Sequence, residues 1–132
     1  MSLDKIKSYL EEYSYLKSIQ SLLMWDMETM MPSGAIDDRA RRLSYVEGKL
    51  HSHITSPKYR KLLNELGKQK LRPLEKKLAR ELKYDFDLNR KFPLKHVLEL
   101  TTARTHATHA WGEARKKNDW ESFRPHLQKL IE

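Results

Sequence analysis

The most informative segment of this 132-residue chain is residues 22–35, LLMWDMETMMPSGA. Its first half continues an apolar helical pattern, and Pro32 and Gly34 then interrupt that pattern. Proline disfavours helix in the residue before it, and glycine frees the backbone for a turn. The segment therefore predicts the end of one helix, a tight break, and a second helix that begins at about Ala35.

Asp26 is the unusual residue of this segment, because it lies beside Trp25 in an apolar run. A carboxylate in such a place needs a partner, since burial of an unpaired charge is costly. Arg39 and Arg42 follow the break, and either can offer Asp26 a bidentate guanidinium. Two interpretations stay open: a strut that locks the first two helices together, which we favour, and a carboxylate that lines a cleft.

Apolar residues recur every three or four positions along the rest of the chain, which is the pattern of helices with one buried stripe. Strand-like alternation is absent, so we expect an all-α fold with about six helices in an antiparallel bundle or hairpin array. The predicted helices span 3–30, 35–52, 57–67, 72–90, 94–117 and the segment after Asp119. The predicted stripes include Ile19, Leu74, Leu78, Leu94 and Trp120. Ser33, Ser56 and Asp119 are predicted helix caps, and His51 and His53 are predicted to lie in a loop.

The length fits a single domain, by the usual size of about 100–200 residues. The chain has no cysteine, which excludes disulfides and thiolate metal sites. No segment reaches the roughly 20 apolar residues of a membrane span, and no signal-peptide pattern opens the chain. We therefore expect a cytoplasmic protein with no membrane partner.

The net charge of +8 is concentrated in one segment. Residues 58–91 contain 12 Lys and Arg against 5 Asp and Glu, whereas the rest of the chain contains 14 against 13. Such a segment could face phosphates or an acidic protein. The basic residues do not alternate with the aromatic or glycine-rich stretches that support binding of a nucleic-acid strand. We therefore favour a solvated helical face and do not expect nucleic acid as a partner.

His106, His109 and Glu113 are the candidate metal ligands. They are spaced three and four residues apart on one predicted helix, hence on one face, and imidazole and carboxylate are zinc ligands. The peptidase pattern H-E-x-x-H, however, places two histidines four apart with a glutamate beside the first. We therefore favour polar residues on a packed helix over a metal site, and we assign no catalytic residue to the chain.

Three blocks of the chain resemble the carboxypeptidase Taq family, a group of zinc-dependent metallocarboxypeptidases. The first is residues 22–40. The second is residues 50–57, LHSHITSP, which lead to Leu62 and Leu63. The third is WGEARKKNDW at 111–120 with FRPHL at 123–127, similar to the family's Trp-x-x-Ala-Arg-x-x-Asn-Asp-Phe-x-x-Phe-x-Pro-x-Leu, with Trp120 where Phe is usual.

The resemblance implies an almost entirely helical fold in which the N-terminal helices form a wall or lid over a deep cleft. Family members are much longer, and their H-E-x-x-H helix, later glutamate and His-Pro-Phe block are absent here. No catalytic position is therefore transferred to this chain. The candidate structural or cleft-lining residues are Trp25, Asp26, Thr29, Pro32, Arg39, Trp111 and Arg115.

Three hypotheses follow. In the first, the chain is an N-terminal fragment or truncated relative of a zinc metallocarboxypeptidase, inactive alone. Its partner is then the remainder of the peptidase, or a second copy that covers exposed apolar surface, while zinc and the peptide substrate belong to the full-length enzyme. In the second, it is an independent module that binds an acidic protein or nucleic acid through residues 58–91. In the third, His106, His109 and Glu113 hold a metal of their own.

Overall fold

The computed structural model describes residues 2–132, and this part of the chain forms six α-helices and one 3-10 helix, with no strand. The all-α prediction with about six helices is confirmed. The elements are α1 (Ser2–Thr29), η1 (Ser33–Ala35), α2 (Ile36–Ile54), α3 (Pro57–Gly67), α4 (Pro73–Asn89), α5 (Leu94–Lys117) and α6 (Trp120–Ile131).

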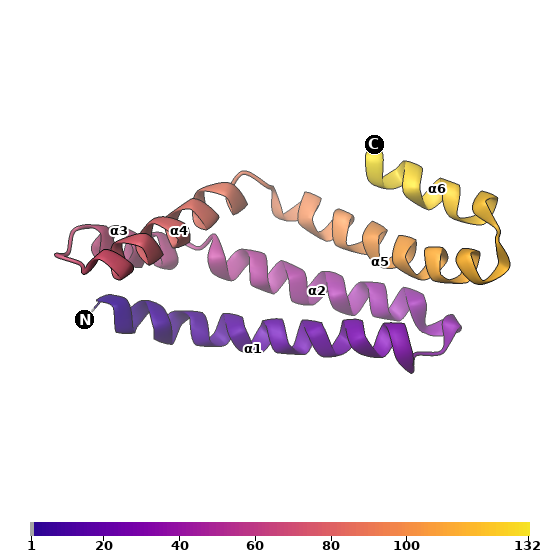
Figure 1. Cartoon of the computed structure of the whole chain (residues 1–132), viewed down its shortest axis with the longest axis horizontal. Coiled ribbons are helices and arrows are strands. Elements are labelled where there is room, and N and C mark those ends of the chain that lie inside the picture. Colours follow the sequence, from indigo (N-terminus) through magenta and orange to yellow (C-terminus); the bar gives the residue numbers. More distant parts are fainter. Residues whose placement is uncertain (1) are drawn as a thin grey trace.

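The helices form an open hairpin array (Figure 1). The long helix α2 packs against α1 on one side and α5 on the other, and α6 folds back along α5. Helices α3 and α4 pair at the end of the array where the N-terminus lies. No helix in residues 2–132 is long and apolar enough to cross a membrane.

A cluster of buried hydrophobic side chains lies where α1, α3 and α4 meet. Its buried side chains are Ile6, Tyr59, Leu63, Leu66 and Phe86. A second buried row runs along α2 and comprises Ala40, Leu43, Val46 and Leu50. These residues are three or four apart in each helix, so the predicted periodicity places them inward.

Tyr9 connects α1 to the junction between α2 and α3. Its hydroxyl donates a hydrogen bond to the carbonyl oxygen of His53 at 2.8 Å and lies 2.6 Å from the hydroxyl of Ser56. Ser56 in turn accepts a bond from the backbone N–H of Tyr59 at 3.0 Å, which caps α3 as predicted. The Tyr9 ring also stacks on His53, with 4.1 Å between the ring centroids.

Two local predictions are wrong. Helix α2 continues to Ile54 and includes His51 and His53, because nothing breaks it before the cap at Ser56 and Pro57. Ser33 does not cap α2, since it lies in η1 and the cap position of α2 is Ala35, which makes no side-chain bond. The predicted cap at Asp119 is confirmed by a 3.2 Å bond from the backbone N–H of Ser122.

Several stripe residues predicted to be buried are instead exposed. They are Ile19, Leu74, Leu78, Leu94 and Trp120. In α4 the pattern is correct only near Phe86, where the helix meets α3, while the first turns of α4 extend beyond the core. The spacing of the apolar residues therefore predicted which side of each helix is apolar. It did not predict how much of that side a neighbouring helix covers.

Candidate functional site

The predicted contact of Asp26 is made by Arg39. The Nη2 atom of Arg39 donates to Asp26 Oδ2 at 2.6 Å, and Nη1 donates to the backbone carbonyl of Leu23. The guanidinium is thus divided between a carboxylate and a carbonyl, rather than bidentate on Asp26 as predicted. The side chain of Arg39 is 13% exposed and that of Asp26 36% exposed, so the pair ties α1 to the first turns of α2 in a half-buried place.

Arg42, the alternative partner, turns the other way. Its Nε atom donates to Asp38 at 2.9 Å within the same helix, and its side chain is 64% exposed. An exposed pair four residues apart on one helix contributes little to stability. The structure therefore distinguishes the two arginines that the sequence left open.

Trp25, Thr29 and Pro32 present a surface rather than a cavity. The Trp25 side chain is 58% exposed although it lies beside the half-buried Asp26. The hydroxyl of Thr29 donates to the carbonyl oxygen of Trp25 at 2.7 Å, and the carbonyl of Pro32 accepts the backbone N–H of Ala35 at 3.0 Å. These bonds close the end of α1 and leave the indole ring open to a partner.

A second interhelical contact joins α2 to α5. Atom Nε2 of His106 lies 2.9 Å from Asp37 Oδ1, and Nδ1 lies 2.9 Å from the carbonyl oxygen of Thr102. Both ring nitrogens therefore face acceptors from the protein. Sequence reasoning missed this contact, because Asp37 and His106 are 69 residues apart and carry no local signal.

The three candidate metal ligands do not fit a metal ion. Both nitrogens of His106 are already engaged, and Glu113 accepts a hydrogen bond from Lys116 at 3.1 Å. That bond, with the charge of Lys116, holds the pKa of Glu113 below its usual value. Within residues 2–132 no group of three or more histidine and carboxylate side chains is placed to hold a metal ion.

Trp111 and Arg115 form a pair of their own on α5. The guanidinium carbon of Arg115 lies 5.5 Å from the centroid of the Trp111 ring, which is the geometry of a cation–π contact. Both side chains are exposed. The structure does not bring them into contact with Trp25 or Asp26, because α2 lies between α1 and α5 (Figure 1).

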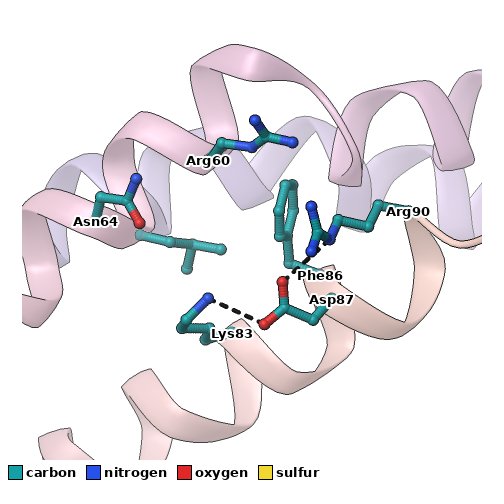
Figure 2. A pocket seen from close by; sticks show the side chains of 7 residues that line it. Arg60, Asn64, Lys83, Phe86, Asp87 and Arg90 are labelled. Atoms are coloured by element: carbon teal, nitrogen blue, oxygen red, sulfur yellow. Dashed lines mark hydrogen bonds and ion pairs between the residues drawn. The ribbon is translucent and has the colours of Figure 1, made fainter.

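A polar cavity lies between α3 and α4 (Figure 2). It has a volume of about 210 Å³ and is lined by Arg60, Leu63, Asn64, Lys83, Phe86, Asp87 and Arg90. The basic segment predicted from the sequence contains all of these residues. The sequence did not indicate which of its charges share a cavity, because that depends on how α3 and α4 pair.

Asp87 is held by two of the cations of this cavity. Lys83 Nζ lies 3.0 Å from one carboxylate oxygen and Arg90 Nε lies 3.2 Å from the other. The hydrogen bond from Lys83, helped by the charges of Lys83 and Arg90, holds the pKa of Asp87 below its usual value. Arg60 lies instead over the ring of Phe86, with 5.6 Å between the guanidinium carbon and the ring centroid.

Comparison with known proteins identifies the family. The family model described as carboxypeptidase Taq (M32) metallopeptidase matches residues 5–132. Thermostable carboxypeptidase 1 of Thermus thermophilus is 31% identical over 90% of this chain and 24% of its own length. Thermostable carboxypeptidase 1 of Pyrococcus furiosus is 30% identical over 97% of this chain and 26% of its own length. Carboxypeptidase 1 of Bacillus subtilis is 28% identical over 93% of this chain and 25% of its own length.

A solved structure supports the same assignment. The crystal structure of BsuCP superposes on this chain with a TM-score of 0.92 at 26% sequence identity. The superposition covers 98% of this chain and 27% of the BsuCP chain. The matched region is the N-terminal part of the relatives. The chain therefore belongs to the carboxypeptidase Taq (M32) metallopeptidase family, and it spans about a quarter of the length of the relatives that it matches.

Proposed function

We propose that this chain is a helical wall or lid segment of a metallocarboxypeptidase, an enzyme that removes C-terminal amino acids from peptides. One observation carries the proposal: nearly the whole chain matches the family, while the chain amounts to about a quarter of the relatives' length. In this proposal residues 1–132 form one helical domain that shapes access to a cleft and excludes water from it.

The metal chemistry of the family would come from outside this segment. The 132-residue sequence contains no H-E-x-x-H pattern. His106 lies within hydrogen-bond distance of Asp37, and Glu113 accepts a hydrogen bond from Lys116. We propose zinc as the metal of the complete enzyme. The residues described here would orient helices and peptide, and none of them would activate water.

Exposed apolar side chains on α1 support docking to the remainder of the peptidase. We call them the α1 outer stripe: Tyr15, Ile19, Leu22 and Trp25. They recur every three or four residues, so they share one side of the helix, and Leu22 is 64% exposed. A contiguous apolar surface of this kind marks an interaction site. In the isolated chain, a second copy would be the alternative cover.

The independent binding module is not favoured, since the family match extends over the basic segment 58–91 as well as the rest of the chain. We also propose a cytoplasmic location, with which a chain without cysteine is compatible.

A peptidase assay of the isolated chain tests the proposal. With zinc or cobalt supplied, we expect no release of C-terminal amino acids from short peptides, while full-length carboxypeptidase 1 of Bacillus subtilis serves as the positive control. Turnover that follows the purified chain through a second chromatographic step would refute the division of labour proposed here.

A further inference from the structure

The cavity between α3 and α4 has an excess of positive charge. Three cations, Arg60, Lys83 and Arg90, line it, together with the single carboxylate of Asp87. Both oxygens of Asp87 are already bonded, one to Lys83 and one to Arg90. The cavity is therefore electrostatically incomplete, and an anion from elsewhere would complete it.

Of the three cations that line the cavity, Arg60 is the one with no ion pair to a carboxylate among the described residues 2–132, since Lys83 and Arg90 are both paired with Asp87. Its exposed side chain places the guanidinium carbon 5.6 Å from the centroid of the Phe86 ring, and none of its N–H groups donates to a carboxylate of the described residues. Asn64 lies one helical turn further along α3, and its side chain lines the same cavity (Figure 2). Together they offer a planar fork and an amide donor, which suit a carboxylate.

The size of the cavity suits a small group such as a single side chain. A volume of about 210 Å³ is below the range of about 300–1,000 Å³ that holds drug-sized molecules. The buried groups Leu63 and Phe86 provide an apolar wall for a short aliphatic stem. We infer that this cavity binds a glutamate or aspartate side chain of an acidic peptide segment, with Arg60 as the principal anchor and Asn64 as a second donor.

A nucleic acid fits the same features less well. Binding of single strands relies on aromatic faces that are open to bases, whereas Phe86 is 4% exposed and covered by Arg60. The observations therefore favour one carboxylate at a defined place over a diffuse polyanion.

Titration of the chain with two short blocked peptides, acetyl-Gly-Glu-Gly-amide and acetyl-Gly-Gln-Gly-amide, tests the inference. We expect the Glu peptide to shift the NMR signals of the Arg60 Nε–H and the Asn64 amide, and the Gln peptide to leave them unchanged. We expect Arg60→Gln to weaken binding of the Glu peptide about tenfold, because it removes a charge-assisted hydrogen bond. We expect Arg60→Lys to recover part of this affinity. Thermal unfolding of each variant verifies that it is folded.

Arg104→Gln is the matched control, because Arg104 is exposed on α5 and its loss changes the net charge equally. Equal weakening by Arg60→Gln and Arg104→Gln would mean diffuse attraction and overturn the site. Inorganic phosphate and a short DNA duplex are the competing probes. If either shifts the same signals at lower concentration than the Glu peptide, the assignment to a peptide carboxylate is wrong. Because this readout needs no catalysis, its failure is distinct from failure of the proposed peptidase role.

Discussion

Replacement of Arg39 by methionine should destabilise the chain more than any other exchange of an arginine on α2. Methionine keeps most of the aliphatic bulk but removes the bonds to Asp26 and to the carbonyl of Leu23. The result is a half-buried carboxylate without a counter-charge, together with a carbonyl that has lost a donor.

The burial of the two partners sets the magnitude. Exposed ion pairs contribute about 0–1 kcal/mol, and removal of one partner from a fully buried pair costs about 3–5 kcal/mol. With side chains 13% and 36% exposed, the Asp26–Arg39 pair lies between these limits, and we expect a loss of about 2 kcal/mol. For a chain of this size that corresponds to a fall in Tm of about 8 °C.

Urea unfolding followed by far-UV circular dichroism measures this loss, with Arg42→Met as the matched control. Arg42 makes only an exposed pair within α2, so its replacement should cost about 0.5 kcal/mol or less. A double-mutant cycle with Asp26→Asn should give a coupling energy of about 1 kcal/mol or more. If Arg39→Met and Arg42→Met prove equally mild, the Asp26–Arg39 strut does not hold α1 to α2, and the reasoning fails.

Three further predictions concern other parts of the array. Burial, with the charge of a nearby aspartate, raises the pKa of Tyr59 to about 12 from its usual 10.0. The stability that protonated Tyr59 contributes is therefore complete below pH 10 and is lost as the pH rises toward 12. A pH series of urea unfolding should show a smaller loss of unfolding free energy above pH 10 in Tyr59→Phe than in the unaltered chain. A Cβ at Gly48 would lie 2.8 Å from the terminal methyl Cδ2 of Leu98 on α5, whereas one at Gly112 meets nothing within 4 Å. Because the end of the Leu98 side chain can shift, calorimetry should find Gly48→Ala less stable than Gly112→Ala by about 0.5 kcal/mol. Equal stabilities would contradict close packing of α2 on α5. Replacement of Leu22 and Trp25 by glutamate should reduce self-association of the chain, measured by analytical ultracentrifugation. Tm should not fall, because both side chains are exposed. Unchanged association would exclude the α1 outer stripe as the contact between copies.

The order and limits of the helices could be predicted because local chemistry determines them. Ser56 and Pro57 start α3, Gly67 ends it, and Pro93 precedes α5. The end of α2 is the one helix limit that the sequence clearly mispredicted. The sequence predicted a loop at His51 and His53, although no helix-breaking residue precedes Ser56. Such signals act within a few residues and are visible in one sequence.

The contacts between helices were less predictable, because they depend on which faces meet. The Asp26–Arg39 pair was within reach, since a short break brings the two helices together. The contact of Asp37 with His106 was not, because it depends on how α5 lies against α2. Likewise, the sequence predicted a basic segment, but only the pairing of α3 with α4 placed Arg60, Lys83 and Arg90 around one cavity.

The exposed part of the apolar pattern has a physical reason of the same kind. Leu22 and Trp25 follow the helical period but find no partner helix among residues 2–132. In the proposed function they are covered by the remainder of a peptidase about four times as long, as the relatives' lengths suggest.

The most direct test of this account is a graft. Residues 5–132 replace the matching segment of carboxypeptidase 1 of Bacillus subtilis, and kcat/KM for a short peptide is measured beside the wild-type enzyme and the same enzyme without its matching segment. We predict that the grafted enzyme retains carboxypeptidase activity and that the shortened enzyme lacks it. A folded, zinc-loaded graft that is as inactive as the shortened enzyme would contradict the claim that this chain is a cleft-forming segment of a metallocarboxypeptidase.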